Sequence, residues 1–516
     1  MRVFVTAIVA ITTAAVVAGA AADRALAASL CVGSHGGCYQ TIQSAVDAAH
    51  DGDKITIRPG MYAGGITIDK SVSLEGAGAS STMISGGGPV ITIGVAGAPS
   101  EPAVGITGVT VTGGVNTGTQ ALGGGVYVPA SSAGSGATVT ITDSVVTGNH
   151  AAPASAAIGC GGLPFALASG GGIDNAGTMT LNNVLVTNNQ AGSDVASDAD
   201  GGGITNERQA TLVLRNSLVN LNIARVTTPN GRFGAGGGLF TRKGSTVTID
   251  GSVVNGNTVD YSTSFPADNP CAGFAQAGGI KIGGDTTTAV SIRDSTISHN
   301  DVVATSSGGD LTAFAGGIDD DGVLVLRDSA VSNNRVAATS VGSVFVDSGG
   351  LEIEGTATIS NSRFAGNSVS AVAPAGTAVS QGGGILTVTP ELVTVSDSVI
   401  SNNVASSTTT TGTASVQGAG ILNSGLLELR GVHISDNQGT AIGPAGFAQG
   451  GGIWNGTLFP DGPPIHLTLR NSNVSRNTLS ATAGLVIHGG GVYTTFPVTL
   501  TNSLITKNTP DNCFGC

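Results

Sequence analysis

The stretch that decides the fold is GGGIDNAGTMTLNNVLVTNN, residues 170–189. It joins a glycine cluster, an alternating row of aliphatic residues and a terminal asparagine, and the chain repeats this pattern eleven times, with two or three glycines in each cluster. The terminal asparagine recurs at Asn149, Asn189, Asn222, Asn257, Asn300, Asn334, Asn367, Asn403, Asn437, Asn477 and Asn508. The last glycine of each cluster recurs at Gly125, Gly172, Gly203, Gly238, Gly279, Gly317, Gly350, Gly384, Gly420, Gly452 and Gly491. A repeat of this period is typical of a solenoid, in which each unit buries its apolar face only against its neighbours.

Within each repeat the apolar residues alternate with period two, as in a strand with one buried face. Val139 with Ile141, Leu324 with Leu326 and Leu467 with Leu469 are examples. A further apolar residue stands three positions before each asparagine, as Val146 does. The sequence therefore predicts three short inward-facing strands per repeat and an all-β, single-stranded, right-handed parallel β-helix. We prefer it to a membrane barrel because the chain lacks barrel-length alternation and aromatic girdles.

We expect one solenoid domain over residues 29–516. It comprises an N-terminal cap at 29–60, first coils at 61–120, eleven glycine-rich repeats at 121–508 and a C-terminal cysteine clip at 509–516. The cap should contain a helix, since Ile42, Ala45, Val46 and Ala49 fall on one helical face. Between each asparagine and the next glycine cluster run Ala/Ser/Thr/Gly-rich segments such as 190–200 and 404–417. These segments are predicted to be solvated loops along one edge of the rod.

The first 28 residues are typical of a signal peptide, with Arg2 before an apolar run and a small-residue cleavage site at 25–27. A retained membrane anchor is the alternative. We expect the remaining chain to be secreted or associated with the cell envelope, and not to span a membrane. Its net charge of −13 disfavours a nucleic-acid partner, because phosphate binding requires a basic surface.

Six cysteines fit an oxidising compartment. Of the fifteen connectivities we favour Cys31–Cys38, Cys513–Cys516 and Cys160–Cys271. A redox-active or metal-binding role for the terminal Cys-x-x-Cys is the alternative.

The segment 41–78, TIQSAVDAAHDGDKITIRPGMYAGGITIDKSVSLEGAG, resembles the start of the pectin-lyase-like right-handed β-helix superfamily. The pairs GGGIWN with NVSRN and SGGLEI with RFAGN are similar to the repeats of bacterial polymorphic outer-membrane proteins. The resemblance covers nearly the whole mature chain and implies the fold. It does not imply one chemistry, since the superfamily includes lyases, hydrolases, esterases, epimerases and non-catalytic adhesins. Of the polygalacturonase residue set only Asp319–Asp320 is present, and the epimerase signature is absent.

The residue that follows the first aliphatic position after each glycine cluster should point outward and stack into one column. This column is Tyr127, Asp174, Thr205, Phe240, Lys281, Asp319, Glu352, Leu386, Leu422, Trp454 and Tyr493. The next outward position adds Glu207, Arg242, Asp321 and Glu354.

Three interpretations of the charged part of the column are open. Lys281, Asp319, Glu352 and Arg242 could perform acid–base chemistry on a glycan, because neighbouring coils place carboxylates about 5 Å apart. Asp319, Asp321, Glu352 and Glu354 could hold Ca²⁺ through oxygen ligands, although no cofactor is required. The third interpretation is that alternating charges on a sheet face serve solubility and cross-strand pairing.

Trp454, Tyr493 and Tyr127 are candidate sugar-binding aromatics on the same column, since ring faces stack on sugars. Isolated surface aromatics are nevertheless common. The functional hypothesis is a non-catalytic extracellular rod that binds glycans or acts as a spacer. The alternative is a polysaccharide lyase or glycoside hydrolase that uses the charged face.

Overall fold

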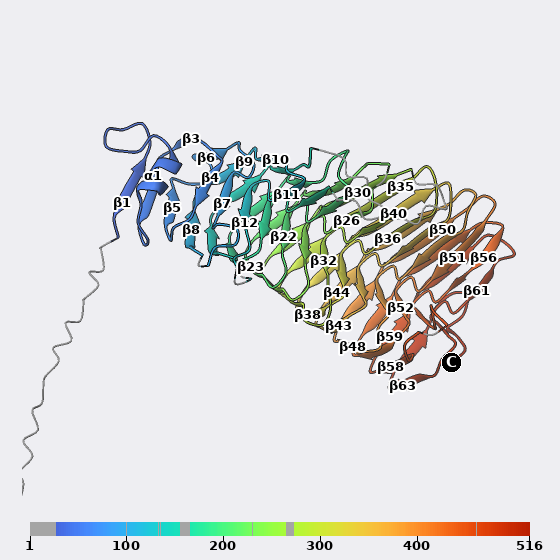
Figure 1. Cartoon of the computed structure of the whole chain (residues 1–516). Helices are drawn as coiled ribbons and strands as arrows, with labels where there is room; N and C mark the ends of the chain where they lie inside the picture. Colours follow the sequence, from blue (N-terminus) through green and yellow to red (C-terminus); the bar gives the residue numbers. More distant parts are fainter. Residues whose placement is uncertain are drawn as a thin grey trace, which may run out of the picture.

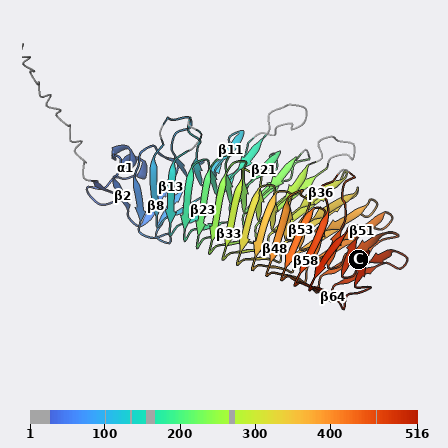
Figure 2. The ribbon, with the colours of Figure 1, turned by 90° about the horizontal axis from the view of Figure 1, so that it is seen from below.

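The computed structural model describes residues 27–516 except positions 100, 133, 135, 155–165, 230, 265–272 and 461. The described chain winds into an elongated stack of coils (Figures 1 and 2). Every pair of neighbouring strands is parallel, as in β38 (Val323–Arg327) against β43 (Thr356–Ser360). The predicted all-β parallel β-helix is confirmed, and it takes the right-handed form expected for crossover connections between parallel strands.

Five sheets run along the stack. Sheet A has 15 strands from β1 (Ser29–Val32) to β63 (Val498–Thr501), and sheet B has 14 from β3 (Gly60–Ala63) to β64 (Leu504–Thr506). Sheet C has 14 strands from β4 (Ile66–Ile68) to β65 (Cys513–Phe514). Sheets D and E have 11 strands each, from β10 (Val115–Asn116) to β60 (Thr478–Ala481) and from β11 (Gln120–Leu122) to β61 (Val486–His488).

A complete coil therefore has five strands, not the three expected. In one coil β38 belongs to sheet A and β39 (Ala330–Ser332) to sheet B. The chain then passes through β40 (Arg335–Ser340) in sheet D, β41 (Val344–Asp347) in sheet E and β42 (Leu351–Ile353) in sheet C. The segments predicted to be solvated loops are strands of sheets D and E, so that prediction was wrong.

Two separate apolar cores account for this difference. Sheets A, B and C enclose a prism packed with Val, Ile and Leu, such as Leu324 and Leu326. Sheets D and E face each other across a second core composed mainly of Ala and Val, such as Ala338 and Val346. Alanine-rich alternation looks polar and loop-like in the sequence, yet every second residue is buried here.

The repeated asparagine forms a continuous ladder between strands of sheets B and D. In Asn334 the side-chain Nδ2 donates to Oδ1 of Asn367 and to the carbonyl of Ile297, both at 3.0 Å. Its Oδ1 accepts from the backbone N and Nδ2 of Asn300. Asn334 is fully buried, and a buried amide needs hydrogen-bond partners within the protein. The coils above and below supply them.

The repeated glycines lie where the coil narrows against this ladder. A Cβ on Gly317, at the third position of its cluster, would lie 2.4 Å from the carbonyl oxygen of Gly350 and 2.9 Å from Nδ2 of Asn334. The first position of the cluster has a positive φ, and Ala315 adopts it there with φ 48°. The third position therefore requires glycine for space, which explains why it is glycine in all eleven repeats.

The N-terminal end is covered by α1 (Ile42–Ala48), as predicted. Thr41 caps the helix by accepting from the Ser44 backbone, and Ile42, Ala45 and Val46 are buried against the first coils. Lys70 Nζ donates to the carbonyls of Val46, Asp47 and Ala49 at the end of the helix, where a cation is favourable.

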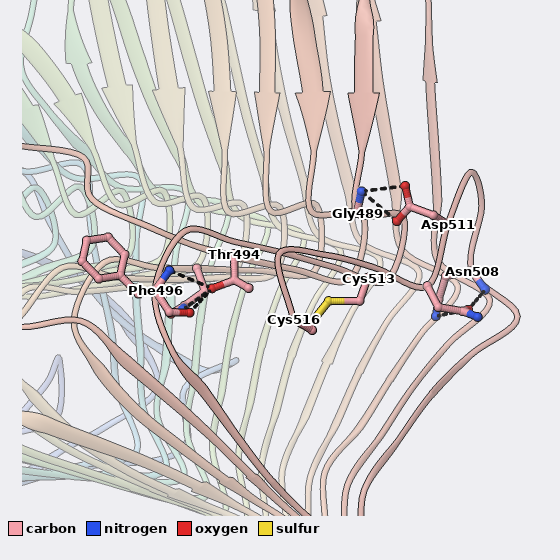
Figure 3. Close-up of a disulfide and its surroundings, with 9 residues drawn as sticks. Gly489, Thr494, Phe496, Asn508, Asp511, Cys513 and Cys516 are labelled. Carbon is pink, nitrogen blue, oxygen red and sulfur yellow. Dashed lines mark hydrogen bonds between the residues drawn. A yellow bond between two sulfur atoms is a disulfide. The ribbon is translucent and has the colours of Figure 1, made fainter.

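The disulfides Cys31–Cys38 and Cys513–Cys516 are formed, as predicted. Figure 3 shows the C-terminal one, where Asp511 accepts from the Gly489 backbone beside the clip. The segment β65 that carries Cys513 extends sheet C by pairing with β62 (Val492–Thr494). The predicted pair Cys160–Cys271 lies outside the described residues, as do residues 1–26 of the predicted signal peptide at 1–28. No helix in the described part of the chain is long and apolar enough to cross a membrane.

Candidate functional site: the corner between sheets C and E

The candidate column lies on the strands of sheet C, and its register is as expected. Lys281 is paired with Asp319, Asp319 with Glu352, and Trp454 with Tyr493 on neighbouring coils. The prediction that the column is solvent-exposed was wrong, however. Lys281, Asp319, Glu352 and Trp454 retain only 5%, 1%, 4% and 5% of their accessible surface.

The outer face of sheet C is buried because the outer face of sheet E folds against it. The rings of Phe233 on sheet E and Phe240 on sheet C are 6.3 Å apart. Similarly, Trp454 Nε1 donates to Gln449 Oε1 at 3.2 Å. The glycine clusters join sheet E to sheet C, and the outer faces of the two sheets meet there at an inward angle. We call this angle the C/E corner.

Lys281 forms the centre of a buried ionic cluster in the middle of the C/E corner. Its Nζ lies 2.9 Å from Asp319 Oδ1 and 2.8 Å from Asp321 Oδ1. On the next coil, the side chains of Asp347 and Glu352 share a hydrogen bond. With the exposed Glu354, five carboxyl groups surround one ammonium, and we call the six residues the Lys281 cluster.

The Lys281 cluster is only partly neutralised. Asp319 Oδ2, Asp347 Oδ1 and Glu352 Oε2 are buried without a hydrogen-bond partner. Burial raises the pKa of Asp319 to about 7, although Lys281 opposes the shift. Burial, together with the charge of Asp347, raises the pKa of Glu352 well above its usual value. Burial likewise raises the pKa of Asp347, so it favours the neutral form of both carboxyls in this pair.

Arg242 belongs to a second ionic cluster on the neighbouring coils rather than to the first. Its guanidinium lies 2.6 Å from Asp200 Oδ2 and 3.1 Å from Glu207, and it sits 4.8 Å from the centre of the Phe240 ring. Burial raises the pKa of Asp200 to about 6, and it raises the pKa of Asp174 well above its usual value. The structure thus does not combine Arg242 with Lys281, Asp319 and Glu352 into one catalytic group.

The three predicted aromatic residues do not form an open platform. Trp454 stacks on Tyr493 with ring centres 6.4 Å apart, and it packs with the buried Leu386 and Leu422. Tyr493 in turn stacks on Phe514. Tyr127 is half-buried, which raises the pKa of its hydroxyl to about 12.

The predicted Ca²⁺ ligands also have other partners. Asp319 and Asp321 bind the Lys281 ammonium, and Glu352 pairs with Asp347. Across the described residues, no group of three or more His, Cys, Asp or Glu side chains is arranged to hold a metal ion.

Sequence reasoning missed the contribution of sheet E to this corner. Phe274, Phe314 and Phe345 lie on its outer face, with ring centres 6.2 Å and 6.3 Å apart in succession. Asp200 and Asp347 come from the same sheet. The alternation in Leu311–Phe314 and Val344–Asp347 was the available signal, since Leu311, Ala313, Val344 and Val346 all face inward.

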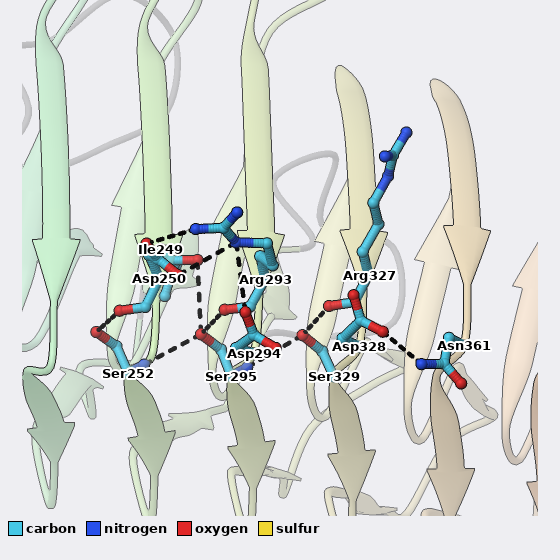
Figure 4. A network of polar contacts seen from close by, with 10 residues as sticks. All are labelled: Ile249, Asp250, Ser252, Arg293, Asp294, Ser295, Arg327, Asp328, Ser329 and Asn361. Carbon is cyan, nitrogen blue, oxygen red and sulfur yellow. Dashed lines mark hydrogen bonds and ion pairs between the residues drawn. The ribbon is translucent and has the colours of Figure 1, made fainter.

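A second polar surface lies at the turn between sheets A and B (Figure 4). Serine hydroxyls form a ladder there, as where the Ser295 backbone N donates to Ser329 Oγ at 3.1 Å. Asp294 and Asp328 precede these serines with positive φ, and together with Arg363 and Asp397 they line a shallow depression of about 550 Å³. The recurring Asx-Ser pair in the sequence marks this surface.

No known family model matches the chain, and no curated protein matches it. Among solved structures, one similarity is to a PL6 family alginate lyase, AlyGC. It has 9% sequence identity and a TM-score of 0.14, and it spans 89% of this chain and 98% of the lyase chain.

Proposed function

We propose that this protein is a non-catalytic, extracellular or cell-envelope rod that binds glycans along the C/E corner. The observation that carries the proposal is the burial of the candidate catalytic groups. Lys281, Asp319 and Glu352 are almost inaccessible, and they are bonded to one another or to neighbouring carboxyls. A general acid or base must come within hydrogen-bonding distance of its substrate, and these groups offer no such approach.

The accessible part of the corner supports a binding role. Phe274 retains 45% of its surface, and the half-buried Phe314 and Phe345 continue the same face. Ring faces with adjacent charged groups provide both stacking and hydrogen bonding, which is the usual composition of a ligand-binding surface. Descent from the pectin-lyase-like superfamily, with repeats of the polymorphic outer-membrane type, is part of this proposal, as is secretion.

Catalysis by the same corner is the second candidate. It is favoured by one observation: Asp319, with a pKa of about 7, lies against the Lys281 ammonium. A group that titrates near neutrality is suited to proton transfer.

One experiment separates these functions. Purified protein is offered uronate and neutral polysaccharides, with binding measured by calorimetry and cleavage measured by release of unsaturated or reducing ends. We expect binding without cleavage. Cleavage that is abolished in Asp319→Asn would replace the binding proposal by the catalytic one, and absence of any binding would leave only a spacer.

A further inference from the structure

The Lys281 cluster and the phenylalanines of sheet E form one continuous surface. Phe314 and Asp347 are register partners on neighbouring strands, β36 (Leu311–Phe314) and β41, with both side chains on the outer face. Asp347 then connects to Glu352 across the corner. We call Phe274, Phe314 and Phe345 the Phe strip. The strip and the cluster therefore lie side by side over three successive coils.

The charge of this surface is unbalanced towards negative. Both ion pairs of the Lys281 ammonium go to Asp319 and Asp321, which leaves Asp347, Glu352 and Glu354 without a cation among the described residues. Three carboxylate oxygens of side chains that are at least nine-tenths buried have no partner at all. Burial disfavours the charged form of these carboxyls, and a cation bound nearby would stabilise that form.

The edge of this surface is accessible. The Asp321 side chain is 28% exposed, Glu354 is exposed, and Phe274 is 45% exposed. A ligand can therefore reach two carboxylates and an aromatic face without opening the corner.

Accessible carboxylates beside an exposed aromatic ring favour an organic cation as the ligand. An ammonium group placed against an aromatic face is attracted by the ring electrons, and its N–H groups can donate to neighbouring carboxylates. A bare metal ion would need convergent oxygen ligands, and the described carboxyls are not arranged in that way. A uronate polymer would bring further negative charge to an acidic surface of a protein whose net charge is already −13.

We propose that the Phe strip and the carboxylates of Asp321 and Glu354 bind a glycan whose sugars carry free amino groups. This inference rests on the proposed glycan-binding function and specifies its ligand class. The ammonium groups lie between the Asp321 and Glu354 carboxylates, and the sugar rings lie on Phe274.

The test compares three matched oligosaccharides by isothermal titration calorimetry on the full chain. These are a glucosamine oligomer with free amines, the same oligomer fully N-acetylated, and a uronate oligomer of equal length. We expect the free-amine oligomer to bind at least ten-fold more tightly than the other two. The variant Asp321→Asn/Glu354→Gln should lose at least ten-fold in affinity, and Phe274→Ala several-fold.

The matched control is Asp294→Asn/Asp397→Asn, which removes two carboxylates from the depression between sheets A and B and should bind as the wild type does. Equal losses in both double variants would show general charge attraction and overturn the inference. Equal binding of the N-acetylated oligomer, unchanged by Asp321→Asn/Glu354→Gln, would overturn it too while the glycan-binding function stands. If a lysine-rich peptide binds and no oligosaccharide does, both the inference and the proposed function fail.

Discussion

The two apolar compartments of each coil are packed in different ways. The prism between sheets A, B and C contains large aliphatic side chains, with Leu326 and Ile353 fully buried. The compartment between sheets D and E contains mostly Ala and Val, as in Ala338 and Val346. The asparagine ladder and the glycine at the third position of each cluster separate them. The comparison shows that every coil narrows at the same place, where the asparagine lies against the glycine. On the outside of the rod, the same narrowing forms the C/E corner.

The largest loss of stability is expected when one asparagine is removed from the ladder that separates the two compartments. Asn334→Ala would remove four buried hydrogen bonds, to Asn300, Ile297 and Asn367, and would leave the backbone N–H of Asn300 without this acceptor. Since each such bond contributes about 0.5–1.5 kcal/mol and an unsatisfied buried group costs about 1–3 kcal/mol, we expect a loss of roughly 3–6 kcal/mol in unfolding free energy. Urea denaturation followed by circular dichroism measures it, with the exposed Asn361→Ala as the control. A loss below that of the control would contradict the structural role of the ladder.

Truncation in the prism is expected to have the next largest effect. Leu326 is fully buried among aliphatic neighbours of the coils above and below. Leu326→Ala should destabilise the protein by about 2–5 kcal/mol, through lost burial and the cavity left behind. The same denaturation experiment provides the measurement, and a change under 1 kcal/mol would indicate that the prism is not tightly packed.

The C/E corner gives the rod a dependence on pH. Asp319 has a folded pKa of about 7, above its value in an unfolded chain, so the folded state binds more protons over that interval. Stability should therefore be greatest in mild acid and decrease as the pH rises from about 4 to about 7. We expect the Tm of the wild type to fall by a few degrees over this range, and less in Asp319→Asn. A Tm that rises over the same range in the wild type would contradict the assigned pKa.

The smallest effect is expected in the compartment between sheets D and E. Val346 is fully buried there, but its replacement removes fewer atoms than Leu326→Ala does. Val346→Ala should cost about 1–3 kcal/mol, in proportion to the apolar surface lost. The exposed Val341→Ala is the control. Equal midpoints for the two variants would mean that this compartment is not a packed core.

The sequence predicted the prism well because each of its strands carries large aliphatics in alternation, as Leu324 and Leu326 do. The asparagine and glycine series placed the corners, and the helix α1 over residues 42–48 followed from its apolar face. Sheets D and E were missed because alanine, serine and threonine have weak preferences, and a segment such as 404–417 becomes a pair of strands only when its neighbours stack on it.

The candidate column was placed correctly in sheet C, but its surroundings were not. Whether Lys281 faces solvent depends on the segment before the glycine cluster. This segment forms sheet E and buries Lys281, but its composition predicted a solvated loop. Phe314 and Asp347 were overlooked for the same reason, since they belong to sheet E. The pairing of Lys281 with Asp319 could be inferred from coil spacing, whereas the Asp347–Glu352 pair required the corner itself.

The folding of sheet E is the central claim, because it creates the second compartment, buries the Lys281 cluster and presents the Phe strip. Hydrogen exchange followed by mass spectrometry measures it directly, by comparing peptides that cover β36 and β41 with peptides that cover β38. We predict slow exchange, within about an order of magnitude of β38, for the sheet E peptides, because their amides are paired in parallel ladders. Complete exchange of β36 and β41 within seconds, with β38 still protected, would contradict the account.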